Sequence, residues 1–255
     1  MNVQHQFIDK SFSTHQLEKM KQGNSASNAD YEFLTQSEFD KLRRMCLTIE
    51  YHEKGKVSNY KGFSADEPAG QMIQKMLNDR LVKWIGPHNI DFFAFNEAIE
   101  PWKIHADLRW HETKIPYKMV LVPMDVEAID NTTSDPWIPT YTIAFDQRDY
   151  LEDSTNTGES HAGNDGPYAT TGKTRICDKP GTHHLKPGYH ITHEEHEKYM
   201  SHFPYDHLDS LTIDNIFEWK PRSAGYWDNN QMHCADNFIK RGIKTKKCLM
   251  ICTLL

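Results

Sequence analysis

The chain has 255 residues, and its 29 Lys and Arg against 36 Asp and Glu give a formal net charge of −7 at pH 7. This balance argues against a nucleic-acid partner, because binding to a phosphate backbone requires a concentrated basic surface. No stretch approaches the roughly 18 apolar residues of a membrane-spanning helix, so we expect no membrane partner either. The 12 Phe, 11 Tyr and 6 Trp are typical of a folded core.

The sequence is typical of a cytoplasmic protein. Its first 20 residues are polar and lack the apolar segment of a secretory signal peptide. Its five cysteines are odd in number and include no CxxC pair, which favours reduced thiols.

Two amphipathic helices are expected before residue 90. Apolar residues recur at helical spacing over residues 39–49, behind Ser37, and again over residues 72–84. A start signal lies at residues 64–68, and Gly86-Pro87 ends the second pattern. We therefore expect residues 1–89 to form a helical layer that packs on a β core.

After residue 90 the apolar pattern becomes that of short strands. They are expected at residues 90–98, 117–122, 141–145, 225–227 and 247–255. Most of them have no helix between them, which favours an all-β sandwich or jelly roll over a parallel α/β sheet. A segment rich in Gly, Ser, Thr, Asn and Asp, about residues 152–188, is expected to form a lid.

The sharpest local feature is the pair His105 and Asp107. In a strand, residues i and i+2 point to one face, with Cα atoms about 6–7 Å apart, so both side chains can converge on one ion. Further along the chain, His233 follows a short apolar strand and precedes a basic loop and the last strand. Two imidazoles and one carboxylate form the ligand set that suits ferrous iron and leaves coordination positions open.

The motif His105-x-Asp107, the distal His233 and a basic residue at the start of the last strand resemble the Fe(II)/2-oxoglutarate-dependent oxygenases. Within them, the sequence is most similar to the phytanoyl-CoA-hydroxylase-like branch. The resemblance covers roughly residues 90–255. It implies a double-stranded β-helix (a cupin-like jelly roll) as the catalytic core, with the long lid inserted and with α structure added by the N-terminal helical layer.

The resemblance also implies an activity. Fe(II) would be held by His105, Asp107 and His233, with 2-oxoglutarate as cosubstrate and O2 as oxidant. The enzyme would hydroxylate a small-molecule substrate and release succinate and CO2. Related halogenases lack the carboxylate that Asp107 supplies here, so its presence favours hydroxylation.

Family members carry a basic residue in the last strand that binds the distal carboxylate of 2-oxoglutarate. Lys246 is the preferred candidate here, and its rivals are Lys244, which shares its strand face, and Arg241. Lysine would act as a point charge where arginine would bind with two hydrogen bonds. Further hydrogen bonds to the cosubstrate are expected from Tyr117 or Lys118 and from Asn96.

The histidine-rich segment 183–207 contains a sequence that superficially resembles a zinc-protease motif. His193 and His196 are three residues apart, whereas HExxH requires four for both rings to share a helix face. Thr192 before Glu194 and Glu195 is typical of a helix N-cap, so a polar surface helix is expected, with contact to substrate as the alternative. Cys234 follows His233 directly, and neighbouring strand residues face opposite sides, which disfavours a Cys–His dyad.

Two other functions remain open from the sequence. One is a cupin-like metalloenzyme that does not use 2-oxoglutarate and needs no basic anchor. The other is a non-catalytic metal- or ligand-binding module whose site is the histidine-rich segment. No pattern in the sequence selects one substrate or one oligomeric state.

Overall fold

The computed structural model describes residues 12–23, 26–107, 111–130, 137–148, 154–156, 175–177 and 188–255. The expected lid at residues 152–188 therefore lies almost entirely outside the described residues. Within it, β7 (Ser154–Asn156) pairs in antiparallel fashion with β8 (Arg175–Cys177). None of the described helices combines the length and the apolar character that a membrane crossing requires.

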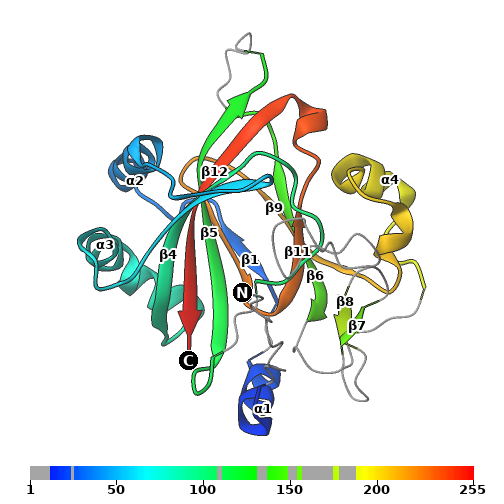
Figure 1. Ribbon diagram of the computed structural model, residues 1–255, viewed down its shortest axis with the longest axis horizontal. Coiled ribbons are helices and arrows are strands. Elements are labelled where there is room, and N and C mark those ends of the chain that lie inside the picture. The colour runs from blue at the N-terminus through cyan, green and yellow to red at the C-terminus, as the bar shows by residue number, and fades with distance from the viewer. Residues whose placement is uncertain are drawn as a thin grey trace, which may run out of the picture.

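Two antiparallel sheets form the body of the protein (Figure 1). The large sheet has the order β1 (Asn28–Asp30), β10 (Ala224–Asp228), β5 (Pro116–Ala128), β12 (Ile243–Leu254), β4 (Asn89–Ala98), β3 (Ser58–Phe63), β2 (Glu53–Lys54). The small sheet has the order β11 (Gln231–Ala235), β6 (Tyr141–Arg148), β9 (Ile213–Glu218). This mainly antiparallel arrangement confirms the predicted double-stranded β-helix with added helices.

The two predicted helices are present as α2 (Gln36–Thr48) and α3 (Pro68–Ile85). Thr35, not Ser37, caps α2, because its side chain accepts a hydrogen bond from the backbone of Glu38, whose carboxylate bonds back to the cap. Helix α3 starts with Pro68 in its first turn and ends at Gly86, whose φ of 87° favours glycine.

Helices α2 and α3 cover the outer face of the large sheet, on the side of the molecule opposite α4 (His193–Glu195) (Figure 1). Fully buried side chains from both layers form this core, among them Leu42, Ile73, Leu77, Phe95 and Leu249. The hydrophobic effect thus fixes the outer face of β4 and β12, and their alternate residues must point into the space between the sheets.

The region before residue 90 is more than a helical layer. It also supplies β1, β2 and β3 to the large sheet, and a further helix, α1 (Thr14–Gln22), that packs against the small-sheet side of the core. The sequence did not indicate these strands, because they are short and largely polar and lack apolar alternation, and β1 and β2 lie at the edges of the sheet. Strand β9 was missed for a similar reason, since polar residues interrupt it.

The packing of α3 on the sheet yields a stability prediction. Leu77 is fully buried, so Leu77→Ala should lower the free energy of unfolding by about 2–5 kcal/mol through lost burial and a residual cavity. Val82 lies on the same helix and is 38% exposed, so Val82→Ala should change it by less than about 0.5 kcal/mol. Chemical denaturation followed by circular dichroism measures both, and equal losses would contradict this packing.

Candidate metal centre and adjoining cavity

His105 and His233 are brought together by their backbones. The N–H of His105 donates to the carbonyl of His233 at 2.9 Å, and the N–H of His233 donates back at 2.8 Å. His105 thereby extends the small sheet beyond β11, although it lies outside any named strand. The two ring centroids are 4.3 Å apart, so both imidazoles face the same point.

The carboxylate of Asp107 completes the cluster. Its oxygens lie 3.6 Å from Nε2 of His105 and 3.1 Å from Nε2 of His233. One ligand atom from each residue lies within 4.8 Å of the others, and no other such group of three occurs in the part of the chain that the structure describes. Burial raises the pKa of Asp107, but the neighbouring His233 and His105 outweigh it and hold that pKa well below its usual range.

Both imidazoles are oriented by backbone carbonyls. Nδ1 of His105 is 2.7 Å from the carbonyl of Lys103, and Nδ1 of His233 is 3.0 Å from the carbonyl of Gln231. A carbonyl can only accept, so each Nδ1 donates to it, and each ring is thereby turned so that Nε2 points toward Asp107. Two neutral nitrogens and one carboxylate fit a ferrous ion with open positions better than a closed zinc site, which needs a fourth protein ligand.

A cavity of about 540 Å³ lies between the two sheets and reaches the three ligand residues. Its volume is in the range of pockets that bind small molecules. Most of its wall is apolar and aromatic, formed by side chains that include Phe92, Trp102, Met119, Leu121, Trp219 and Trp227. Trp102 lies against the ring of His105 and Trp227 against that of His233, with centroids 5.1 and 4.6 Å apart.

Lys246 brings a cation to the cavity. Its side chain is 1% exposed, and Nζ lies 3.0 Å from the carbonyl of Tyr141, 3.4 Å from Asp236 and 4.0 Å from the centroid of Trp219. Burial lowers the pKa of Lys246, and the carboxylate of Asp236 opposes this effect. A buried ammonium can form a charge-assisted hydrogen bond with an anionic ligand.

The two rival cations lie elsewhere. Lys244 is the extra residue of a β-bulge between Ile243 and Thr245, and its exposed ammonium pairs with Glu127 at 2.7 Å. Strict alternation of side chains along the strand would place Lys244 on the same face as Lys246, but the bulge turns the side chain of Lys244 outward. Arg241 pairs with Asp236 behind the cavity wall, and neither cation lines the cavity.

The other candidate contacts to the cosubstrate differ in whether they line the cavity. Asn96 is 9% exposed, lines the cavity and lies opposite Tyr60 and Cys248 in the sheet register. Tyr117 does not line the cavity, because its hydroxyl donates to the carbonyl of Ile85 on the helix-covered side of the sheet. Lys118 forms an ion pair with Asp228.

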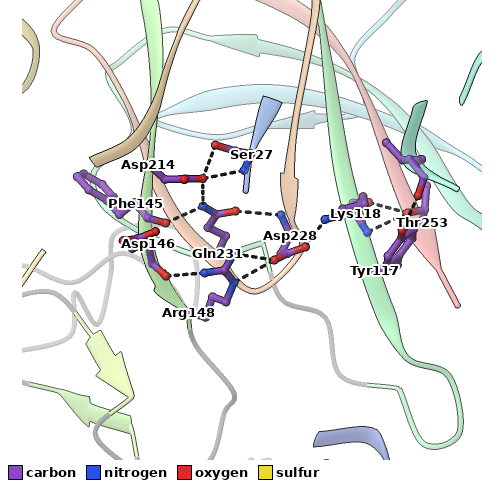
Figure 2. A network of polar contacts seen from close by, with 11 residues as sticks. Ser27, Tyr117, Lys118, Phe145, Asp146, Arg148, Asp214, Asp228, Gln231 and Thr253 are labelled. Atoms are coloured by element: carbon purple, nitrogen blue, oxygen red, sulfur yellow. Dashed lines mark hydrogen bonds and ion pairs between the residues drawn. The ribbon is translucent and has the colours of Figure 1, made fainter. Parts of the chain in front are cut away.

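That ion pair belongs to a buried polar network beside β11 (Figure 2). Asp228 is contacted by Lys118 and also accepts hydrogen bonds from Nε and Nη2 of Arg148 at 2.9 and 2.8 Å. All three side chains are at most 5% exposed. The two cations join β5 and β6, which lie in different sheets, to the end of β10.

Gln231 links this network to His233. Its side-chain amide donates to the carbonyl of Phe145 at 2.7 Å and to Asp214 at 2.9 Å, and its side-chain oxygen accepts from the N–H of Asp228 (Figure 2). Its backbone carbonyl holds Nδ1 of His233. The sequence did not indicate Asp228 and Gln231, because the run Asp228-Asn229-Asn230-Gln231 resembles an exposed turn although every member is buried.

The histidine-rich segment has structural contacts. Thr192 caps α4 as predicted, in a capping box with Glu195, and the chain continues as a π-helical turn (His196–Met200). The ring of His193 stacks on Tyr205 with centroids 3.8 Å apart. Nε2 of His202 lies 3.3 Å from the carbonyl of Trp102, and burial lowers the pKa of His202 to about 4. Residues 183–187 lie outside the described part of the chain.

Cys234 is fully buried, and burial raises its pKa well above its usual value. A protonated thiol is a poor nucleophile. This agrees with the expectation that the cysteine does not act with His233.

Comparison with known proteins gives similarities of structure alone. No family profile matches the sequence, and no curated protein matches it. HygX from Streptomyces hygroscopicus, solved with nickel, 2-oxoglutarate and hygromycin B bound, shares 10% identity over 95% of this chain and 87% of its own, with a TM-score of 0.48. The epimerase SnoN, solved with Fe3+, alpha ketoglutarate and nogalamycin RO, shares 13% identity over 95% of this chain and 84% of its own, with a TM-score of 0.49.

A third similar structure is a prolyl-4-hydroxylase from Pseudomonas putida. It shares 8% identity over 94% of this chain and 97% of its own, with a TM-score of 0.40.

The network beneath His233 yields a second prediction. Asp228→Asn should lower the free energy of unfolding by about 3–5 kcal/mol, because it removes the buried negative charge that Lys118 and Arg148 share. Glu197→Gln removes a carboxylate from an exposed pair with Lys240 and should cost less than about 1 kcal/mol. Urea denaturation of both variants measures the difference, and a tolerated Asp228→Asn would show that the network is not needed for the fold.

Proposed function

We propose that the chain is a non-haem Fe(II)- and 2-oxoglutarate-dependent dioxygenase that hydroxylates a small molecule, as in the phytanoyl-CoA-hydroxylase-like branch. The observation that carries this proposal is the convergence of His105, Asp107 and His233 on a cavity that also contains the buried ammonium of Lys246. We further propose residues 90–255 as the catalytic core. Cys46, Cys234, Cys248 and Cys252 are free and buried, which suits the reducing cytoplasm.

His105, Asp107 and His233 would hold the iron. When bound, iron with 2-oxoglutarate and O2 supplies the oxidising chemistry that inserts oxygen into a C–H bond and yields succinate and CO2. The carbonyls of Lys103 and Gln231 would hold both rings with Nε2 toward the metal, and the negative charge of Asp107 would offset part of the charge of the metal.

Lys246 would bind the distal carboxylate of 2-oxoglutarate. Its ammonium is buried, so little water competes for it and the charge-assisted contact is strong. Asn96, which lines the same cavity, would donate a further hydrogen bond to the cosubstrate.

The substrate would occupy the rest of the cavity. Phe92, Trp102 and Met119 offer apolar surface rather than charge, which favours a substrate with an apolar body. The same walls exclude bulk water from the metal centre.

One observation favours a second candidate, a metalloenzyme of the same fold that does not use 2-oxoglutarate. Lys246 already has partners in the carbonyl of Tyr141 and the carboxylate of Asp236. In that case Lys246 would be a structural cation, and 2-oxoglutarate would not bind.

A binding titration separates the two candidates. We expect the wild-type protein, given Fe(II) and 2-oxoglutarate without oxygen, to develop a visible metal-to-ligand charge-transfer band, and then to form succinate when oxygen is admitted. His105→Ala and Asp107→Ala should each abolish the band by removing a ligand. His193→Ala removes a histidine that stacks on Tyr205 and should leave the band intact. A band that survives without His105 would refute the metal assignment.

The role of Lys246 is tested by its loss. Lys246→Met keeps the volume and removes the charge, so the dissociation constant for 2-oxoglutarate should rise about tenfold or more, which corresponds to about 1.4 kcal/mol. Lys244→Met removes an exposed charge from the same strand and should leave that constant unchanged. Calorimetric titration of the Ni(II)-loaded variants measures both, and the reverse ranking would assign the anchor to Lys244.

A further inference from the structure

Lys246 and Arg241 are joined through one carboxylate. Asp236 is completely buried, with one oxygen 3.4 Å from Nζ of Lys246 and the other 2.9 Å from Nε of Arg241. Thr140 donates a third contact to the same carboxylate at 2.6 Å. The two cations that the sequence offered as rivals therefore act on the same group.

Only one of the two cations faces the cavity. Lys246 is 1% exposed and lines it, whereas Arg241 is 24% exposed and lies behind the wall. Arg241 is fixed there by a hydrogen bond to the carbonyl of Lys198 at 2.5 Å and by the ring of Tyr141, 5.0 Å from its guanidinium carbon. Its position is determined by contacts other than Asp236 alone.

The charges of this cluster do not cancel. Two cations share one carboxylate, so the cluster has one net positive charge. Of the two cations, the ammonium of Lys246 is the one that lines the cavity. A cluster of Lys246 and Asp236 alone would be neutral and would attract an anion weakly. The surplus charge depends on Arg241, although Arg241 does not line the cavity.

We propose that Arg241 is a positioning residue that neutralises Asp236, so that the charge of Lys246 stays available to the distal carboxylate of 2-oxoglutarate. This inference rests on the proposed function and deepens it. It predicts that Arg241 influences only those ligands that place a second carboxylate at Lys246.

The test compares 2-oxoglutarate with 2-oxobutyrate, which keeps the 2-oxo acid group and lacks the distal carboxylate. Both are titrated calorimetrically into Ni(II)-loaded protein. Arg241→Gln should weaken 2-oxoglutarate about fivefold and leave 2-oxobutyrate unchanged. Arg241→Lys should restore the affinity to within about twofold, because it keeps the charge. Lys240→Gln removes a neighbouring cation that pairs with the exposed Glu197 and should have no effect.

A double variant separates charge from structure. Arg241→Gln combined with Asp236→Asn again leaves Lys246 with one net positive charge, so 2-oxoglutarate affinity should return toward the wild-type value. Additive losses, equal losses for both acids or no rescue by Arg241→Lys would overturn the inference, as would an Arg241→Gln protein that binds normally. A wild-type protein that binds neither acid would refute the proposed function, and the inference with it.

Discussion

The reciprocal backbone hydrogen bonds between His105 and His233 are the constraint on which the site depends. They connect a segment that follows β4, in the large sheet, to β11, in the small sheet. Because the bonds fix the two Cα atoms as direct neighbours, the imidazoles must lie side by side, and Asp107, two residues further along the chain, reaches both. The convergence of these three side chains thus follows from sheet closure and does not require a flexible loop.

Two buried carboxylates support this constraint from different sides. Asp228 ties β10 to Lys118 and Arg148, next to the strand that carries His233, and Asp236 holds Lys246 and Arg241 just beyond it. Burying charges costs desolvation energy, and hydrophobic residues of similar size often stabilise a fold as well or better. We therefore interpret both clusters as groups that position neighbouring side chains and set the local electrostatic potential, rather than as sources of stability.

The sequence predicted the features that depend on local periodicity. The two helices and the central strands were found because apolar residues repeat at 3.6 or 2 residues. The candidates His105 and Asp107 were selected by their i, i+2 spacing, and His233 by its place in a motif that resembles an oxygenase family. The sequence did not predict features that depend on tertiary contacts. The bulge that turns Lys244 outward, the placement of Tyr117 under α3 and the burial of Asp228 depend on partners distant in sequence. The short strands β2 and β3 carry no alternating apolar signal, although they line the cavity.

An anaerobic crystal structure of the Mn(II) protein with 2-oxoglutarate tests the central claim most directly, because it locates metal and cosubstrate together. The account predicts one metal ion bound by His105, Asp107 and His233, with the cosubstrate in the cavity and its distal carboxylate in contact with Lys246. A metal ion bound by the histidines of residues 193–207, or a distal carboxylate that is bound away from Lys246, would contradict it.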